Sequence, residues 1–212
     1  EYPAVIKILK DEILKLENKK IIPKGHFVIR RGAGAYICGE ESAMIESIEG
    51  KRGLPRHRPP YVAEVGLFNS PTLTNNLETL FWIRDILEKG AKWYAEKGTG
   101  GNKGFHSFSV SGRVKEPGVK VAPAGITIQE LIDDYCGGMK KDNIFKGYLP
   151  GGASGGILPA SMNKIPLDYG SKELTDAGCF LGSAAIVVLS DKDNMKDVAL
   201  NLLKFFEEES CG

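Results

Sequence analysis

The chain has 212 residues, with 28 lysines and arginines against 27 aspartates and glutamates, so its formal net charge is +1. A nearly neutral chain has no general electrostatic field for nucleic acids or membrane surfaces, so we expect neither as a partner. Its apolar runs fall short of the ~20 residues that a membrane-spanning helix needs, and the length suffices for one large domain or two small ones.

The first predicted helix is followed by a glycine-rich loop and a second helix. Apolar residues at helical spacing define the first helix: Val5, Ile6, Leu9, Ile13, Leu14 and Leu16. Residues 31–42 then read RGAGAYICGEES, and an apolar helical pattern continues through residues 43–48. Glycine lets a ligand approach the backbone closely. Glu40 and Glu41 are expected in the first turn of the second helix, where the helix dipole favours anions.

Two carboxylates at this helix start argue against a phosphate site. A phosphate site at a helix N-terminus normally offers bare N–H groups or a lysine. Glu40 and Glu41 would repel phosphate and instead suit hydroxyls, amides or ring N–H donors. The loop is therefore predicted to hold the polar, uncharged part of a cofactor. On this hypothesis, Glu40→Gln weakens nucleotide handling but leaves thermal stability nearly unchanged.

Residues 50–61, GKRGLPRHRPPY, supply positive charge. Lys51, Arg52, Arg56 and Arg58 lie on a segment that three prolines stiffen. Cations on such a pre-ordered loop can bind a pyrophosphate with little ordering cost, and Tyr61 can stack on a flat ring. The alternative interpretation is a solvated basic loop.

A third helix is predicted after residues 70–76, SPTLTNN. Asn75 and Glu78 have capping-box spacing, and apolar residues continue the helix to Leu87. Helix capping is a sufficient explanation for Asn75 taken alone, whereas Asn76 leaves amide donors at a helix N-terminus that can hold an anion. One strand is expected between the basic segment and this helix. Trp93 and Tyr94 are expected to complete the packing of the helix.

The glycine-rich run 96–104 marks a boundary, after which the apolar period changes to two. Phe108, Val110 and Val114 alternate with polar residues, and residues 119–121 form a return strand after a turn. Thr127 and Glu130 form a capping box that opens a helix, and strands are predicted at 145–149 and 184–189. Two strands, a helix and further strands form a β-grasp pattern.

Two later segments have local structural interpretations. Residues 150–156, PGGASGG, lack the lysine and helix start of a nucleotide loop, so we expect turn geometry or close backbone packing against the first domain. Asp193 is expected to cap a last helix with an apolar stripe that ends at Phe206.

Neither the cysteines nor the histidines show the spacing of a catalytic or metal site. Cys38, Cys136 and Cys179 are expected to be reduced, mostly buried thiols. The three histidines are far apart in the sequence, without triad or metal spacing. No side chain is therefore predicted as a nucleophile or general base.

Three motifs together resemble one family. GAGAYICGEES, EGKRGLPRHRPPY and SPTLTNNLETL occur in the order and spacing of the NADH-binding flavoprotein subunit of respiratory complex I. The same module is the diaphorase subunit of NAD-reducing hydrogenases and NAD-dependent formate dehydrogenases. The resemblance implies an α/β (α+β) chain in three parts. These are the C-terminal part of a Rossmann-like FMN/NADH-binding domain at 1–98, a soluble-ligand-binding β-grasp domain at 105–190, and the start of an iron–sulfur helical bundle at 193–212.

The resemblance also implies the cofactor-binding residues. The FMN and nicotinamide site would be lined by Tyr36, Gly39, Glu40 and Glu41. The flavin phosphate and ribityl chain would be held by Thr74, Asn75 and Asn76. Arg58 and Tyr61 match positions that face the NADH pyrophosphate and adenine, where the family more often has lysine and phenylalanine.

The resemblance further implies that the chain is a fragment. The family's first glycine-rich loop has no counterpart here, and Cys211 would be the first of four ligands of a [4Fe–4S] cluster. One cysteine cannot hold a cluster. We therefore expect the chain to be inactive alone, although the intact subunit would pass a hydride from NADH to FMN and electrons to the cluster.

The implied setting is an NADH:acceptor oxidoreductase on the cytoplasmic side of a membrane complex or in the cytoplasm. Its partners would be a thioredoxin-like subunit and an iron–sulfur subunit. Quinone, a hydrogenase and a formate dehydrogenase all remain open as the final acceptor, as does NADPH in place of NADH. The alternative function is a non-catalytic ligand-binding or docking module, which a titration with FMN and NADH would discriminate.

Overall fold

The computed structural model describes residues 2–212 and has a mixed α/β fold, as predicted. It contains two compact units. The first comprises the described residues up to Thr74 together with Glu207–Gly212, and the second comprises Asn75–Phe206.

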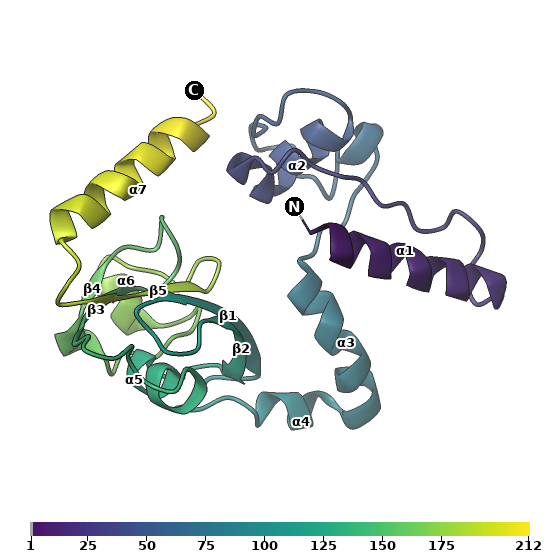
Figure 1. The fold of residues 1–212 in the computed structure, drawn as a ribbon. Coiled ribbons are helices and arrows are strands. Elements are labelled where there is room, and N and C mark those ends of the chain that lie inside the picture. The colour runs from purple at the N-terminus through teal and green to yellow at the C-terminus, as the bar shows by residue number, and fades with distance from the viewer. Residues whose placement is uncertain (1) are drawn as a thin grey trace. The chain divides into compact units, whose positions relative to one another are not determined.

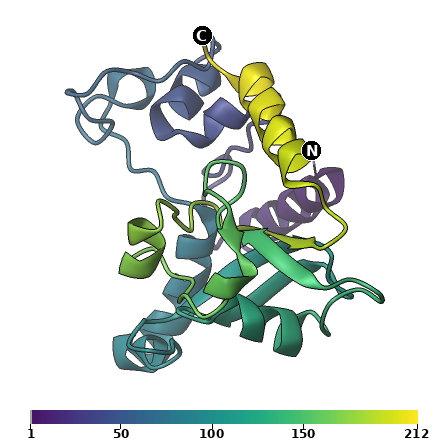
Figure 2. The ribbon, with the colours of Figure 1, turned by 90° about the vertical axis from the view of Figure 1, so that its left-hand side faces the viewer.

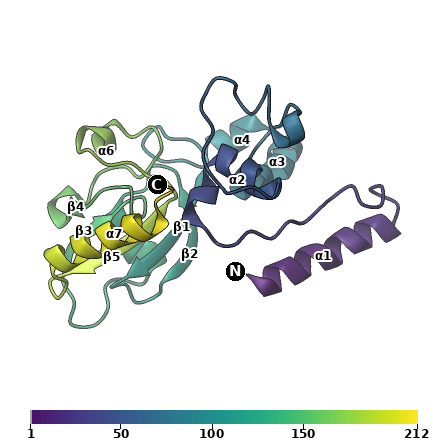
Figure 3. The ribbon, with the colours of Figure 1, turned by 90° about the horizontal axis from the view of Figure 1, so that it is seen from above.

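The first unit is helical, with long irregular connections. Its elements are α1 (Pro3–Asn18), η1 (Tyr36–Gly39), α2 (Glu41–Ile48) and η2 (Leu67–Asn69), and a long irregular segment follows α1 (Figure 3). Both predicted helices are confirmed, and α1 begins with a proline, whose fixed φ suits the first helical position. The residues of α1 are all exposed or half-buried, whereas α2 buries Ala43 and Ile45.

The prediction of a strand after the basic segment is wrong. Residues 62–72 instead make a turn, in which the Thr72 N–H donates to the Val62 carbonyl over 3.0 Å. Phe68 and Asn69 have φ values of 50° and 60° inside this turn, a backbone conformation that a strand excludes.

The second unit begins with α3 (Leu77–Lys89) and α4 (Ala91–Ala95). The cap of α3 is Asn76, whose Oδ1 accepts the Thr79 N–H over 2.8 Å, so the capping box predicted for Asn75 is wrong by one residue. Glu78 instead accepts the Ser107 N–H over 2.6 Å. The predicted packing of Tyr94 on this helix is confirmed, since its ring lies 5.4 Å from that of Trp82.

A five-stranded sheet forms the centre of the second unit (Figure 1). Its strands are β1 (Phe105–Gly112), β2 (Gly118–Pro123), β3 (Phe145–Leu149), β4 (Leu158–Pro159) and β5 (Ala185–Ser190). Their order is β2-β1-β5-β3-β4, with β1 and β5 parallel and the other pairs antiparallel. This arrangement agrees with the predicted β-grasp pattern.

The helical segments of the sheet domain lie between the strands in the sequence. They are α5 (Ile128–Glu130), η3 (Leu131–Tyr135), η4 (Ala160–Met162) and α6 (Lys172–Asp176). The predicted capping box is confirmed, because the Thr127 hydroxyl accepts the Glu130 N–H and Glu130 accepts the Thr127 N–H. The helix continues as a π-helical turn through η3.

The two faces of the sheet carry different helices. Ile186 and Val188 of β5 belong to the main core, with Phe108 of β1 and Leu131 of η3. Successive side chains of a strand point to opposite faces, so Val187 and its alternate neighbours face the other way, toward α7 (Met195–Glu209). Figure 1 shows α5 and α7 on opposite sides of the sheet, and Figure 2 shows α7 following β5 after a short connection.

The glycine-rich run at residues 150–156 has turn geometry, one of its two predicted alternatives, and also packs closely against a neighbouring backbone. A Cβ on Gly151 would lie 2.3 Å from the carbonyl oxygen of Phe180 and 2.4 Å from that of Leu181. Both neighbours belong to the second unit, so this contact is not the packing against the first domain that was the other predicted alternative.

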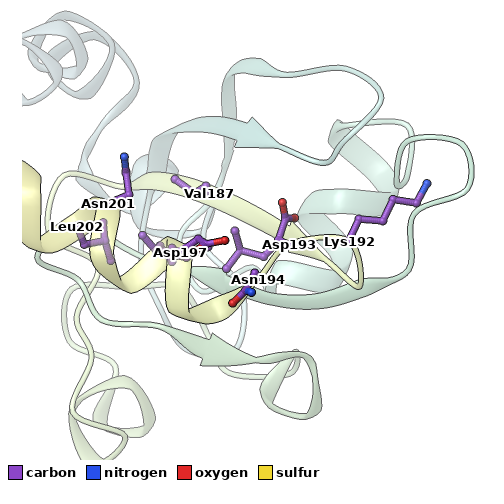
Figure 4. A pocket seen from close by; sticks show the side chains of 10 residues that line it. Val187, Lys192, Asp193, Asn194, Asp197, Asn201 and Leu202 are labelled. Atoms are coloured by element: carbon purple, nitrogen blue, oxygen red, sulfur yellow. The ribbon is translucent and has the colours of Figure 1, made fainter.

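A pocket of about 480 Å³ lies between the sheet and α7. Figure 4 shows Asp193, Asn194 and Asp197 around the start of α7, beside Val187. Its lining does not include the residues predicted to bind cofactors.

Asp193 has a different role from the predicted helix cap. Asn194 takes that role, because its Oδ1 accepts the Lys196 N–H over 2.9 Å. Asp193 accepts the Ser190 N–H over 2.8 Å and a hydrogen bond from Arg113 over 2.6 Å. The hydrogen bond from Arg113 lowers the pKa of Asp193 to about 2, because it outweighs the opposite effect of burial, which raises this pKa.

We expect Asp193→Asn to destabilise the second unit by about 1–2 kcal/mol at pH 7. Because the pKa of Asp193 is lowered on folding, its stabilisation is full above pH 4 and is lost as the pH falls toward about 2. Urea unfolding at pH 7 and pH 2.5 measures this. An equal difference between wild type and variant at both pH values would contradict the assignment.

Candidate functional site

The acidic pair lies at the start of α2. Glu40 is the N-cap, and its Oε2 accepts the N–H groups of Ser42 and Ala43 over 3.0 and 2.9 Å. The Ser42 hydroxyl donates to the same oxygen. Glu41 is in the first helical turn, as predicted, but Glu40 precedes that turn because its carboxylate takes the place of a helix cap.

Glu40 is held in its charged form. Partial burial raises its pKa, but the hydrogen bonds from Ser42 and Ala43 and the charge of Arg58 outweigh this, so the pKa of Glu40 is below its ordinary value. The carboxylate is therefore ionised near neutral pH.

Arg58 joins both carboxylates. Its Nη2 lies 2.5 Å from Oε1 of Glu40 and 2.9 Å from Oε1 of Glu41. The Thr74 hydroxyl donates to Oε2 of Glu41 over 2.8 Å. The structure thus brings together four of the predicted site residues: Glu40, Glu41, Arg58 and Thr74. All four side chains are within reach of solvent, with Arg58 42% exposed.

The two tyrosines and the glycine of the predicted site lie in the same unit. Tyr36 is 50% and Tyr61 56% exposed. The Tyr36 N–H donates to Glu209, and the Tyr61 N–H donates to Glu64. Gly39 ends η1, and a Cβ placed on it would have no heavy atom within 4 Å. The space beside the Gly39 backbone is therefore open.

The two asparagines of the predicted site belong to the second unit, and both are exposed. Asn76 uses its Oδ1 as the cap of α3, so its amide N–H group is what it can offer to a ligand. Asn75 directly precedes it in the chain.

Cys211 lines a small pocket with Cys38. This pocket of about 210 Å³ also includes Arg52, whose guanidinium donates to the Cys211 carbonyl over 3.5 Å. All four cysteines are free thiols, and burial raises the pKa of Cys136 and Cys179, as inert thiols require. Within residues 2–212, no group of three or more histidine, cysteine or acidic side chains is placed to hold a metal ion.

Sequence reasoning missed two side-chain networks. Arg56 was grouped with the phosphate-binding cations, but it bonds to Glu46 and Glu49. Glu46 lies on α2 and Glu49 is its C-cap, so their spacing of three residues places them on one side of the helix end and was a usable signal. His106 was considered isolated, but its Nε2 lies 2.6 Å from Asp168. The two residues are 62 positions apart in the sequence, so the pair leaves no local signal.

The comparisons with known proteins identify what the chain is similar to. Residues 1–85 match the family of the Nuo51 FMN-binding domain. An NADH-quinone oxidoreductase subunit of Rhizobium meliloti (strain 1021) is 43% identical over 184 residues, which cover 87% of this chain and 43% of that protein. The corresponding NADH-quinone oxidoreductase subunit of Rickettsia felis is 42% identical over 186 residues, again 87% of this chain and 43% of that protein.

Solved structures lead to the same group. A crystal structure of an NAD⁺-reducing [NiFe]-hydrogenase in the air-oxidised state matches with a TM-score of 0.83 and 31% identity, over 99% of this chain and 35% of that one. The H₂-reduced state matches with a TM-score of 0.72 and 34% identity, over 85% of this chain and 30% of that one.

Fold and comparisons together define an α/β chain whose residues 1–85 match the Nuo51 FMN-binding domain. More specifically, the chain is similar to these NADH-quinone oxidoreductase subunits, which confirms the resemblance carried by the three motifs. It spans less than half the length of these curated relatives. The helices within residues 2–212 are all too short or too polar to cross a membrane.

Proposed function

We propose that the chain forms part of the FMN- and NADH-binding region of an NADH:acceptor oxidoreductase. The observation that carries this proposal is the contact of Arg58 with Glu40 and Glu41 beside the glycine-rich loop, inside the region that matches the FMN-binding domain. This contact places two carboxylates beside one guanidinium. The carboxylates suit the uncharged hydroxyl and amide groups of a flavin–nicotinamide pair, and the guanidinium suits its phosphates.

The donor chemistry fits the cofactors. Glu41 already accepts a hydroxyl hydrogen bond from Thr74, which is the kind of contact that ribityl or ribose hydroxyls would make. The open space beside Gly39 suits close approach of a flat ring, and Tyr36 and Tyr61 are exposed enough to stack on one. Asn75 and Asn76 would offer amide donors to the flavin phosphate at the start of α3.

The chain's part in the reaction is binding and orientation. FMN, when bound, supplies the chemistry of accepting a hydride from NADH and releasing the electrons singly. Arg58 would bind the NADH pyrophosphate, Tyr61 would contact the adenine, and Glu40 and Glu41 would hold hydroxyl and amide groups. None of these roles makes a side chain a nucleophile or a general base, in agreement with the sequence.

A [4Fe–4S] cluster does not fit the described residues alone. Cys211 supplies one thiolate, whereas a cluster needs four ligands. Cys211 remains a proposed first ligand. The proposed partners are the other subunits of a redox complex, including a thioredoxin-like and an iron–sulfur subunit, at the cytoplasmic side of a membrane or in the cytoplasm.

The test uses the subunit in its native complex, with Arg58→Gln. We expect the variant to retain FMN and to show a KM for NADH raised about fivefold to tenfold with kcat nearly unchanged, because a charge-assisted contact to bound pyrophosphate is lost. Flavin absorbance and NADH oxidation by ferricyanide measure these quantities. Lys24→Gln, which removes an exposed cation outside both loops, is the control.

Two results would contradict the proposal. An unchanged KM in Arg58→Gln would remove Arg58 from the nucleotide site. A wild-type subunit without FMN and without NADH oxidation would reject the catalytic function and favour a docking module.

A further inference from the structure

Arg56 directs four side-chain hydrogen bonds to protein groups, more than the neighbouring Arg58. Its Nε donates to Glu46, and its Nη2 donates to Glu49 over 3.3 Å. Its Nη1 donates to the carbonyls of Val65 and Gly66, each over 3.2 Å. A guanidinium has five N–H donors, and four hydrogen bonds directed at these groups leave little for a phosphate.

The backbone of Arg56 connects to the acidic pair through Ser42. The Arg56 N–H donates to the Ser42 hydroxyl over 2.9 Å, and that hydroxyl donates to Oε2 of Glu40. Ser42 is 1% exposed, so this link is shielded from water. The other oxygen of Glu40 accepts from Arg58, two residues beyond Arg56. The four residues therefore close a ring of contacts between α2 and the basic segment.

We infer that Arg56 is a positioning residue that fixes Arg58 against Glu40 and Glu41. Its side chain fastens residues 50–61 to α2 and to the turn at residues 65–66. Ordering this loop before a ligand arrives lowers the entropy that binding must overcome. The inference rests on the proposed function only in naming the NADH pyrophosphate as the ligand of Arg58.

Arg56 also separates two roles among the cations of the basic segment. The sequence groups four cations as candidate phosphate contacts, but geometry divides them. Lys51 lies 2.7 Å from Glu49, on the same carboxylate cluster that holds Arg56. Of Lys51, Arg56 and Arg58, it is Arg58 that contacts the acidic pair at the glycine-rich loop. Arg56 and Lys51 therefore shape the loop, and Arg58 faces the site.

The first test needs no ligand and uses the full chain. The pKa of Glu40 is measured by NMR titration of its side-chain carboxyl in wild type, Arg58→Gln, Arg56→Gln and the double variant. We expect each single substitution to raise the pKa of Glu40, and Arg58→Gln to add little in the Arg56→Gln background. Lys24→Gln should leave this pKa unchanged. Arg56→Lys, which keeps the charge but loses donors, serves if Arg56→Gln does not fold.

A purely structural role gives a different result. In that case Arg56→Gln or Arg56→Lys lowers the melting temperature, yet Arg58→Gln still raises the pKa of Glu40 by as much as in wild type. That outcome would overturn the inference.

The second test measures NADH oxidation by the subunit in its native complex. We expect Arg56→Gln to raise the KM for NADH about threefold to fivefold with kcat unchanged, and to add little in the Arg58→Gln background. If the increases in KM from the two substitutions multiply in the double variant, Arg56 does not act through Arg58. If the complex does not oxidise NADH at all, the proposed function fails, whereas the NMR titration still decides whether Arg56 positions Arg58.

Discussion

Replacing Phe108 by alanine is expected to destabilise the second unit by about 3–5 kcal/mol. Phe108 lies on β1, has no exposed surface, and packs in the core formed by the sheet with α5 and η3. Removing the ring loses its transfer free energy and leaves a cavity that neighbouring strands cannot close, because β1 is paired on both sides.

Urea unfolding of the full chain, followed by circular dichroism, measures this loss. Val119→Ala on β2 is the matched control, because Val119 is 69% exposed and its truncation should change the free energy of unfolding by less than about 0.5 kcal/mol. Similar losses in the two variants would show that Phe108 is not in the core.

The alternation that singled out Phe108 shows which parts of the fold a sequence reveals. Phe108 and Val110 are buried and Ser109 is exposed, as period-two alternation predicts. The capping box at Thr127 is equally local and was confirmed. β4 has two residues and α6 has five, so neither is long enough to show a period. Their formation depends on tertiary contacts.

The start of α3 shows the limit of local rules. Asn75 and Asn76 are both good caps, and Glu78 at the right spacing favoured Asn75. In the structure, Glu78 instead accepts the Ser107 N–H near the start of β1, and the cap is Asn76. A contact across 29 residues thus overrode the local pattern.

The candidate site shows the same difference between local features, which the sequence predicts, and contacts between distant residues, which it does not. The chemical type of each residue was predictable, since acidic, basic and amide side chains were assigned to different parts of a cofactor. The pairing of Arg58 with Glu40 was not, because 18 residues separate the two and no period connects them. This pairing explains how two adjacent carboxylates are accommodated at one helix start: a guanidinium and two backbone N–H groups offset their repulsion.

Glu40 also has a structural role that its position in the motif did not reveal. The sequence predicted that Glu40→Gln would leave thermal stability nearly unchanged. In the structure, Glu40 caps α2 with two backbone N–H hydrogen bonds and accepts from Ser42. The site and the helix therefore share one carboxylate, and a substitution there affects both.

We accordingly expect Glu40→Ala to destabilise the first unit by about 1–2 kcal/mol at pH 7 and to lower its melting temperature by several degrees. Glu40→Gln should lose less stability than Glu40→Ala. Its amide oxygen can still accept the helix N–H groups, although the charge facing Arg58 is gone. Differential scanning calorimetry of the full chain measures both. Glu12→Gln on α1, at an exposed position, is the control.

The pH dependence separates the cap from a simple loss of volume. Because the pKa of Glu40 is lowered on folding, its stabilisation is complete above the ordinary carboxyl value of 4.5 and is lost as the pH falls through the folded pKa. The difference between wild type and Glu40→Ala should therefore shrink on acidification below pH 4.5. A difference that stays constant between pH 7 and pH 3 would mean that the charged carboxylate does not hold the start of α2, and would remove the common anchor of helix and site.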